Sequence, residues 1–211
     1  RTILELPHGI PSHDTFGRVF RQIKPDEFQG SYMDWVKTIQ KEIEGEVIAI
    51  DGKQLHGSKD ESQDQAAIDM VSAWATQNQL VLGQRKVAEK SNEITAIPEL
   101  LELLDVEGCI VTIDAMGCQK KIANKIVSKQ ADYILAVKEN QKELFEDIQD
   151  SFKVLKPSYT NEDIDYGHGR IETRKCYVLT DLSLVEEAKK WKGLTSIIKI
   201  ERDRFFKPTG K

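Results

Sequence analysis

The sequence predicts an α/β fold built on a mixed sheet, and three observations support this. Short β-branched runs at 47–50 and 109–113 each end on an aspartate, as strands buried between helices can. The hydrophobic period changes from two to 3.6 after residue 88, which indicates that consecutive strands give way to alternating helices and strands. The 211 residues suffice for one core and a small extra segment.

The composition narrows the class of protein. With 39% hydrophobic and 31% charged residues, it is typical of a globular protein. No apolar run reaches the ~20 residues that cross a membrane, and no signal-peptide pattern precedes the first polar residues. The three cysteines are odd in number and lack a CxxC spacing, which argues against a disulfide framework and a zinc site, so we expect a protein of the reducing cytoplasm. Because the net charge is −5, nucleic-acid binding would require a local basic surface.

Residues 1–45 are predicted to be helical. Asp14 is expected to cap a helix that carries Phe16 and Phe20, and Pro25 is expected to open a second helix. We expect the aromatic residues of both helices to pack rather than to form a binding platform.

Residues 46–156 form the central predicted segment. Its first three strands are expected to pair antiparallel. A helix capped by Ser91 or Asn92, with Pro98 in its first turn, then starts two strand–helix–strand crossovers. The expected strands and helices are, in order, 46–52, 66–75, 80–87, 91–104, 109–114, 119–129, 131–138 and 141–153.

This βββαβαβ order matches the ribonuclease-H-like fold, in which the first and fourth strands are central neighbours, so Asp51 and Asp114 should lie side by side. Adjacent carboxylates repel, and a divalent cation relieves that repulsion; hard oxygen ligands suit Mg²⁺ or Mn²⁺. Two ions ~4 Å apart can activate an attacking oxygen and stabilise a leaving one in phosphodiester chemistry. In the alternative interpretation, the two aspartates are unrelated turn residues.

Seven motifs spread along nearly the whole chain carry a family resemblance. They are GIPSHDTF (9–16), IAIDGKQLHGS (48–58), MVSAWA (70–75), EKSNEITAIP (89–98), VTIDAMGCQ (111–119), ADYILAVK (131–138) and GHGRIE (167–172). Through them the sequence resembles the H-repeat-associated class of bacterial insertion-sequence transposases, in the DDE superfamily.

The resemblance implies a ribonuclease-H-like core that cuts and joins transposon DNA with Mg²⁺ or Mn²⁺, two ions filling the complete site. Asp51 and Asp114 match the first two catalytic acids of the family and would be the metal ligands. The implied partner is double-stranded DNA, as transposon ends and as target. No membrane partner is implied, and a homodimer is left open.

The third catalytic acid is where this sequence departs from the family. Related transposases carry that glutamate on a helix, in a pattern resembling His-Trp-x-Ile-Glu-Asn, after a β-rich insertion. Since no such pattern precedes Lys211, we expect 157–211 to be the insertion and the chain to be truncated after it. Glu172 is the rival within the chain; the competing interpretation is an exposed strand position between arginines. His56 stands where we expect arginine in the family.

Residues 157–211 are also expected to supply DNA contacts. Strands at 175–180 and 195–201 flank a predicted helix at 184–191. The candidates for phosphate contacts are Arg170, Arg174 and Lys175, the basic tail residues Arg202, Arg204, Lys207 and Lys211, His168 between two glycines, and Lys138 of the central segment. Alternatively, these charges are ordinary solvated side chains.

The sequence therefore predicts the catalytic core of a DDE-type transposase that cleaves and transfers DNA strands with divalent metal and is incomplete at its C-terminus. Two alternatives stay open. One is a catalytically inactive remnant that acts only as a DNA- or protein-binding module. The other is a host nuclease of ribonuclease-H-like fold.

Overall fold

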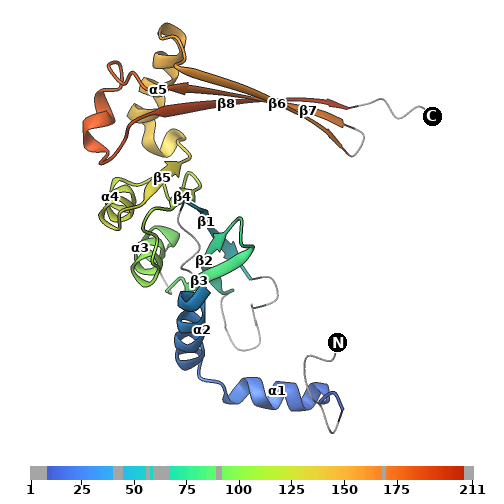
Figure 1. The fold of residues 1–211 in the computed structure, drawn as a ribbon. Coiled ribbons are helices and arrows are strands. Elements are labelled where there is room, and N and C mark those ends of the chain that lie inside the picture. Colours follow the sequence, from blue (N-terminus) through green and yellow to red (C-terminus); the bar gives the residue numbers. More distant parts are fainter. Residues whose placement is uncertain are drawn as a thin grey trace, which may run out of the picture. The chain divides into compact units, whose positions relative to one another are not determined.

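A computed structural model describes residues 9–39, 45–55, 58, 67–88, 92–167 and 170–206, and the chain divides into two compact units, Arg1–Ile43 and Glu44–Lys211. The first unit contains helices α1 (His13–Gln22) and α2 (Pro25–Ile39) (Figure 1). Pro25 opens α2, as predicted. The predicted cap of α1 is wrong: Ser12 caps this helix through its Oγ, and Asp14 lies in the first turn, where its charge favours the helix N-terminus.

The aromatic residues of the first unit are mostly exposed. Helix α1 contains no buried residue, and Phe16 and Phe20 are 46% and 66% exposed. In α2, Met33 and Val36 are buried, whereas Phe28 and Trp35 are exposed. The expectation that these aromatic residues pack is therefore wrong for most of them, because two helices alone offer little surface to cover an apolar stripe.

The second unit is built on a five-stranded sheet of order β3-β2-β1-β4-β5. Strand β1 pairs antiparallel with β2, and β2 with β3, whereas β4 lies parallel to both β1 and β5. This confirms the predicted ribonuclease-H-like mixed sheet and the central position of the first and fourth strands. The strands are β1 (Val47–Gln54), β2 (Asp69–Ala75), β3 (Leu80–Lys86), β4 (Ile110–Ile113) and β5 (Asp132–Leu135).

The helices of this unit are α3 (Glu93–Leu103), α4 (Lys120–Ser128) and α5 (Lys142–Val154), with a 3₁₀ turn η3 (Glu139–Gln141) before α5. Asn92 is the N-cap of α3, one of the two expected caps. The placement of Pro98 was wrong: it lies inside α3, beyond the first turn. The loss of one backbone hydrogen bond there is offset by burial of the apolar side chains that flank it, Ala96, Ile97, Leu100 and Leu101.

Helices α3 and α4 cover one face of the sheet more completely than the other face is covered. Ile48, Ile50 and Val111 are buried; α3 contacts β2 and β3, and α4 contacts α3 and β5 (Figure 1). On the opposite face, a row runs from Trp74 through residues 49 and 112 to Ile134. Trp74 and Ile134 are 39% and 48% exposed, so this face remains partly open.

A buried carboxylate fixes the start of β1. Glu46 is 2% exposed, and its Oε1 accepts hydrogen bonds from the backbone N–H groups of Gln77 (2.7 Å) and Asn78 (2.9 Å), while its Oε2 accepts one from the Asn78 side chain (2.8 Å). Charge-assisted hydrogen bonds of this kind are about twice as strong as neutral ones. Glu46 thereby ties the β2–β3 turn to the strand that carries Asp51.

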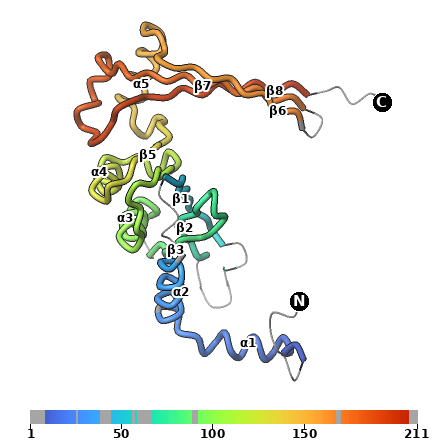
Figure 2. Tube along the Cα trace, viewed as in Figure 1, coloured from blue at the N-terminus to red at the C-terminus, as the bar shows by residue number. Residues whose placement is uncertain are grey.

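The C-terminal part forms a second, three-stranded antiparallel sheet of β6 (Tyr159–Gly167), β7 (Arg170–Leu179) and β8 (Ile197–Phe206), which Figure 2 traces. Strand β6 was not predicted. Strand β7 confirms that Glu172 lies on a strand, although it starts at Arg170, before the strand expected at 175–180. The predicted helix at 184–191 is a 3₁₀ helix, η4 (Glu186–Lys190). A buried cluster including Cys118, Leu144 and Trp191 joins this part to α4 and α5.

Candidate active site

Asp51 and Asp114 occupy matching positions on neighbouring parallel strands. Ile50 pairs with Ile113; Asp51 is the next residue of β1, and Asp114 directly follows the end of β4. Neighbouring strands lie about 4.8 Å apart, so the register places the two aspartates side by side. Both are exposed. The structure therefore brings together the two acids that the sequence singled out.

A tight turn orients the carboxylate of Asp114. Its Oδ1 accepts hydrogen bonds from the backbone N–H groups of Met116 (3.0 Å) and Gly117 (3.4 Å). The turn is also held from η3, where the side-chain amides of Asn140 (2.6 Å) and Gln141 (2.9 Å) donate to two of its carbonyl oxygens. The acid is thus positioned by backbone and amide groups before any ligand arrives.

Gly117 is required by the packing of this turn. A Cβ atom there would lie well under 3.0 Å from the Ile113 side chain and 3.1 Å from that of Ile97. Both side chains are buried, so neither can move away freely. We expect Gly117→Ala to destabilise the chain by about 1–3 kcal/mol in urea unfolding. Gly30→Ala, in α2, is the control, since a Cβ there meets nothing within 4 Å; equal stability of Gly117→Ala and wild type would contradict this prediction.

A third carboxylate, Glu93, lies close enough to the two aspartates for their charges to act on it. It is the first residue of α3, and its carboxylate occupies the space above Gly52, where a Cβ atom would collide with it. Burial raises the pKa of Glu93, and the charges of Asp114, Asp51 and Asp69 raise it further. Sequence reasoning did not assign a role to Glu93. The available signal was the glycine directly after Asp51, which permits close approach of another group.

The two aspartates supply oxygen ligands of the kind that a hard divalent cation prefers, and a positive charge between them would relieve their repulsion. In the described part of the chain, however, no three His, Cys, Asp or Glu side chains are grouped closely enough to hold a metal ion.

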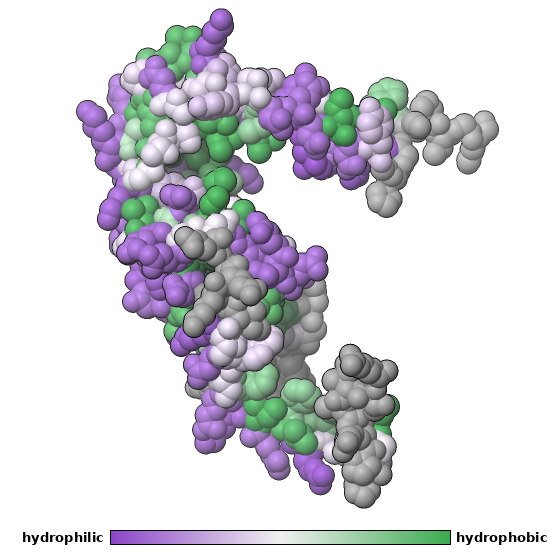
Figure 3. Space-filling view, in the orientation of Figure 1, coloured by the Kyte–Doolittle hydropathy of each residue, from purple (hydrophilic) through white to green (hydrophobic). Residues whose placement is uncertain are grey.

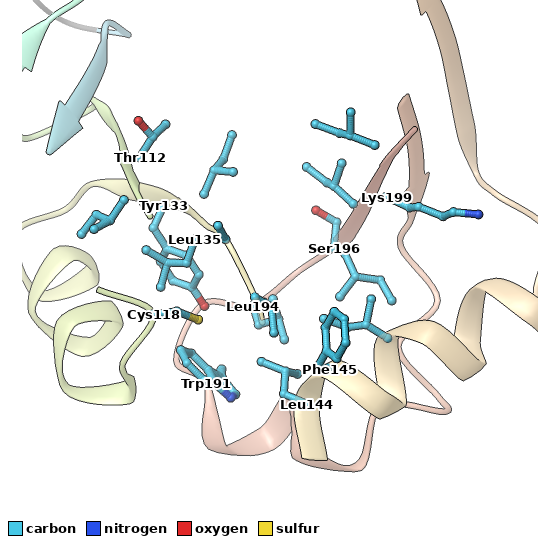
Figure 4. A pocket seen from close by; sticks show the side chains of 18 of the residues that line it. Thr112, Cys118, Tyr133, Leu135, Leu144, Phe145, Trp191, Leu194, Ser196 and Lys199 are labelled. Carbon is cyan, nitrogen blue, oxygen red and sulfur yellow. The ribbon is translucent and has the colours of Figure 1, made fainter. Parts of the chain in front are cut away.

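A pocket of about 1110 Å³ reaches Asp114 from the open face of the sheet. Figure 4 shows its wall, which includes Tyr133, Phe145 and Trp191 and is largely apolar. The indole N–H of Trp191 is buried, and no described residue accepts its hydrogen. Burial raises the pKa of Cys118, in the same wall, to about 11, so this thiol stays protonated near neutral pH.

The other predicted residues lie on other elements or outside the described residues. Lys138 follows β5 and is exposed. Arg170 and Arg174 flank Glu172 on β7. His168 and His56 lie outside the described residues, as do Lys207 and Lys211.

Glu172 is surrounded by arginine side chains. Its side chain is 2% exposed, so the interpretation as an exposed strand position is wrong. Burial favours the neutral carboxyl, but the hydrogen bond and charge of Arg174, with the charges of Arg202 and Arg204, bring the pKa of Glu172 below its ordinary value. The carboxylate is therefore ionised at neutral pH.

Comparison with known proteins identifies relatives. The family model described as "Transposase DDE domain" matches residues 42–193, and one described as "DDE_Tnp_1-associated" matches residues 1–36. The chain is 43% identical over 201 residues to the putative transposase YncI of Escherichia coli O157:H7, covering 92% of this chain and 51% of that protein. It is 41% identical over 199 residues to the H repeat-associated putative transposase YhhI of Escherichia coli K12, covering 92% and 52%. It thus spans about half the length of these relatives.

Among solved structures, the piggyBac transposase synaptic complex with hairpin DNA matches with a TM-score of 0.40 at 12% sequence identity. The match covers 78% of this chain and 41% of that one.

In the described part of this chain, no helix has the length and apolar character needed to cross a membrane.

Proposed function

We propose a function that starts from family membership: this chain belongs to the transposase DDE-domain family, in its H-repeat-associated class. The proposed activity is divalent-metal-dependent cleavage of double-stranded DNA at a transposon end, followed by strand transfer to target DNA. The observation that supports the proposal is the register of β1 and β4, in which Asp51, within β1, lies beside Asp114, the residue after the end of β4.

The proposed metal ligands are Asp51 and Asp114, whose charges also act on Glu93. Mg²⁺ or Mn²⁺, once bound, would supply activation of the attacking oxygen and stabilisation of the leaving one. The chain's own contribution is preorganisation: the backbone turn at 114–117 and the amides of Asn140 and Gln141 fix the direction of the Asp114 carboxylate. Glu172 stays a candidate for the third catalytic acid, although its ion pairs are with arginines.

An inactive module that only binds DNA or protein is the second candidate. It is favoured by one observation, the absence of a group of three metal-ligating side chains among the described residues.

Binding of Mn²⁺, followed by electron paramagnetic resonance, tests the proposal on the 211-residue chain. We expect wild type to bind Mn²⁺ at millimolar concentration and Asp51→Asn or Asp114→Asn to weaken binding by at least about tenfold. A unit charge ~4 Å from a cation contributes about 4 kcal/mol at an effective dielectric constant of ~20, before desolvation, which exceeds the ~1.4 kcal/mol that corresponds to tenfold. If the wild-type chain binds no Mn²⁺ at millimolar concentration, the proposed metal-dependent activity is wrong.

A further inference from the structure

One face of the three-stranded sheet gathers four arginines around a single buried carboxylate. The Oε1 atom of Glu172 lies 2.5 Å from Arg174 Nη2 and 3.1 Å from Arg202 Nε, and its Oε2 lies 3.1 Å from Arg204 Nε and 3.7 Å from Arg170 Nη2. The carboxylate is 2% exposed, whereas the four arginine side chains are 40–49% exposed. The glutamate is thus covered by the groups that it binds.

Strand register explains this arrangement. Glu172 pairs with Arg204, and Arg174 with Arg202, while residues 170, 172 and 174 alternate onto one face of β7. We call Arg170, Arg174, Arg202 and Arg204 the arginine face. The edge strand β6 places Asp165 and Asp163 on the same side, and Asp163 lies 3.9 Å from Arg174.

The arginine face is rich in hydrogen-bond donors. Arg202 and Arg204 each contact Glu172 through Nε, and each guanidinium group has four further N–H donors besides Nε–H. One carboxylate cannot neutralise four guanidinium groups, and the two aspartates of β6 offset the remainder only at one edge. The positive charge is therefore concentrated along β7 and β8; Figure 3 shows hydrophilic residues interspersed with hydrophobic ones on this sheet.

The opposite face of the same sheet is different. There Lys175 lies 3.9 Å from Glu162, and Lys199 lies 2.6 Å from Glu201, so each cation has its own acid. Both lysine side chains are about as exposed as the arginines, at 39% and 46%. Positive charge in excess over its ion-pair partners is thus a property of one face and not of the whole sheet.

We propose that the arginine face contacts the phosphate backbone of double-stranded DNA, and that Glu172 is the positioning residue that holds its guanidinium groups in place. This inference rests on the proposed function, because it gives the partner of that activity a binding surface. Planar guanidinium forks match phosphate oxygens in two-point contacts. A half-exposed row across two strands, rather than an enclosed cavity, suits a continuous polyanion better than a single small anion.

The test compares two double variants that remove the same charge from opposite faces of one sheet. Arg202→Gln with Arg204→Gln removes two cations from the arginine face, and Lys175→Gln with Lys199→Gln removes two from the other. Binding of a fluorescently labelled 30-base-pair DNA duplex to the whole chain is followed by anisotropy in EDTA at several salt concentrations. We expect the arginine variant to bind at least about tenfold more weakly and to lower the slope of log K against log salt by about 2, because each phosphate contact contributes ~0.9. The lysine variant should stay within about twofold of wild type.

Two single variants isolate the role of Glu172, because each makes the arginine face more positive by one charge. Asp165→Asn should strengthen DNA binding. Glu172→Gln should weaken it and lower the salt slope, because the guanidinium groups lose their common anchor. Circular dichroism and thermal unfolding would verify that both variants fold. Strengthening of binding by Glu172→Gln would show that charge alone matters and would overturn the positioning role.

The outcomes separate this inference from the proposed function. Binding in EDTA does not require metal, so duplex binding that depends on the arginine face supports the inference even if the chain cleaves nothing. Equal weakening by the arginine and lysine variants, or a wild type that binds no duplex, would overturn it while leaving metal binding at Asp51 and Asp114 untouched.

Discussion

Asp51→Asn and Asp114→Asn should each reduce Mn²⁺-dependent nicking of supercoiled plasmid by about a thousandfold. The cation contributes several kcal/mol of transition-state stabilisation in phosphodiester chemistry, and each ~1.36 kcal/mol corresponds to tenfold in rate. Asparagine keeps the size of the side chain but removes the charge that holds the ion. The measurement is conversion of supercoiled plasmid to nicked circles on agarose gels over time, at saturating protein.

Asp132→Asn is the matched control for this prediction. Asp132 is an exposed aspartate at the start of β5, where residue 110 of β4 is its partner, so it lies at the opposite end of the parallel strands from Asp114. Its variant should nick at the wild-type rate. Nicking by Asp51→Asn at the same rate as by Asp132→Asn would contradict the assignment of the acid pair.

Much of the central sheet could be predicted because each of its strands has a recognisable sequence pattern of its own. The runs before Asp51 and Asp114 are apolar and β-branched, and both are central strands in the structure. The order of elements then limits the topology, since two parallel crossovers after an antiparallel meander place β1 beside β4. The adjacency of the two acids follows from topology and not from any local pattern.

Strand β6 could not be found in this way. Residues 161–166 are all exposed. Because this strand has no buried face, its sequence shows no alternation of apolar and polar residues. The strand is specified by its pairing with β7, for example between Asp165 and Glu172. Glu172 shows the same limit, because its burial depends on Arg202 and Arg204, some thirty residues further along the chain.

Glu93 illustrates why the site itself was only partly predictable. The N-cap at Asn92 predicts that Glu93 lies in the first turn of α3. Its approach to Gly52, however, depends on how that helix packs on the sheet. Likewise, Asn140 and Gln141 reach the Asp114 turn only because η3 follows directly after β5.

The stability of the metal-free chain should depend on pH through Glu93. Its pKa in the folded chain is raised by burial and by neighbouring aspartates. The stabilising contribution of the protonated group is therefore complete below the ordinary pKa of glutamate and is lost as pH rises through the raised folded pKa. Glu93→Gln is neutral throughout, so in EDTA it should be more stable than wild type at neutral pH, and the difference should vanish in acid. Thermal unfolding from about pH 4 to about pH 8 measures this.

Millimolar Mg²⁺ should separate the two causes of that shift. A cation beside Asp51 and Asp114 offsets their repulsion of Glu93 but leaves its burial unchanged, so the advantage of Glu93→Gln at neutral pH should shrink or reverse. Gly52→Ala gives an independent check, because the added Cβ displaces only the flexible end of Glu93 and should weaken the pH dependence without unfolding the chain. If Glu93→Gln follows wild type at every pH, then Glu93 does not share the electrostatic field of the two aspartates, and the site is the aspartate pair alone.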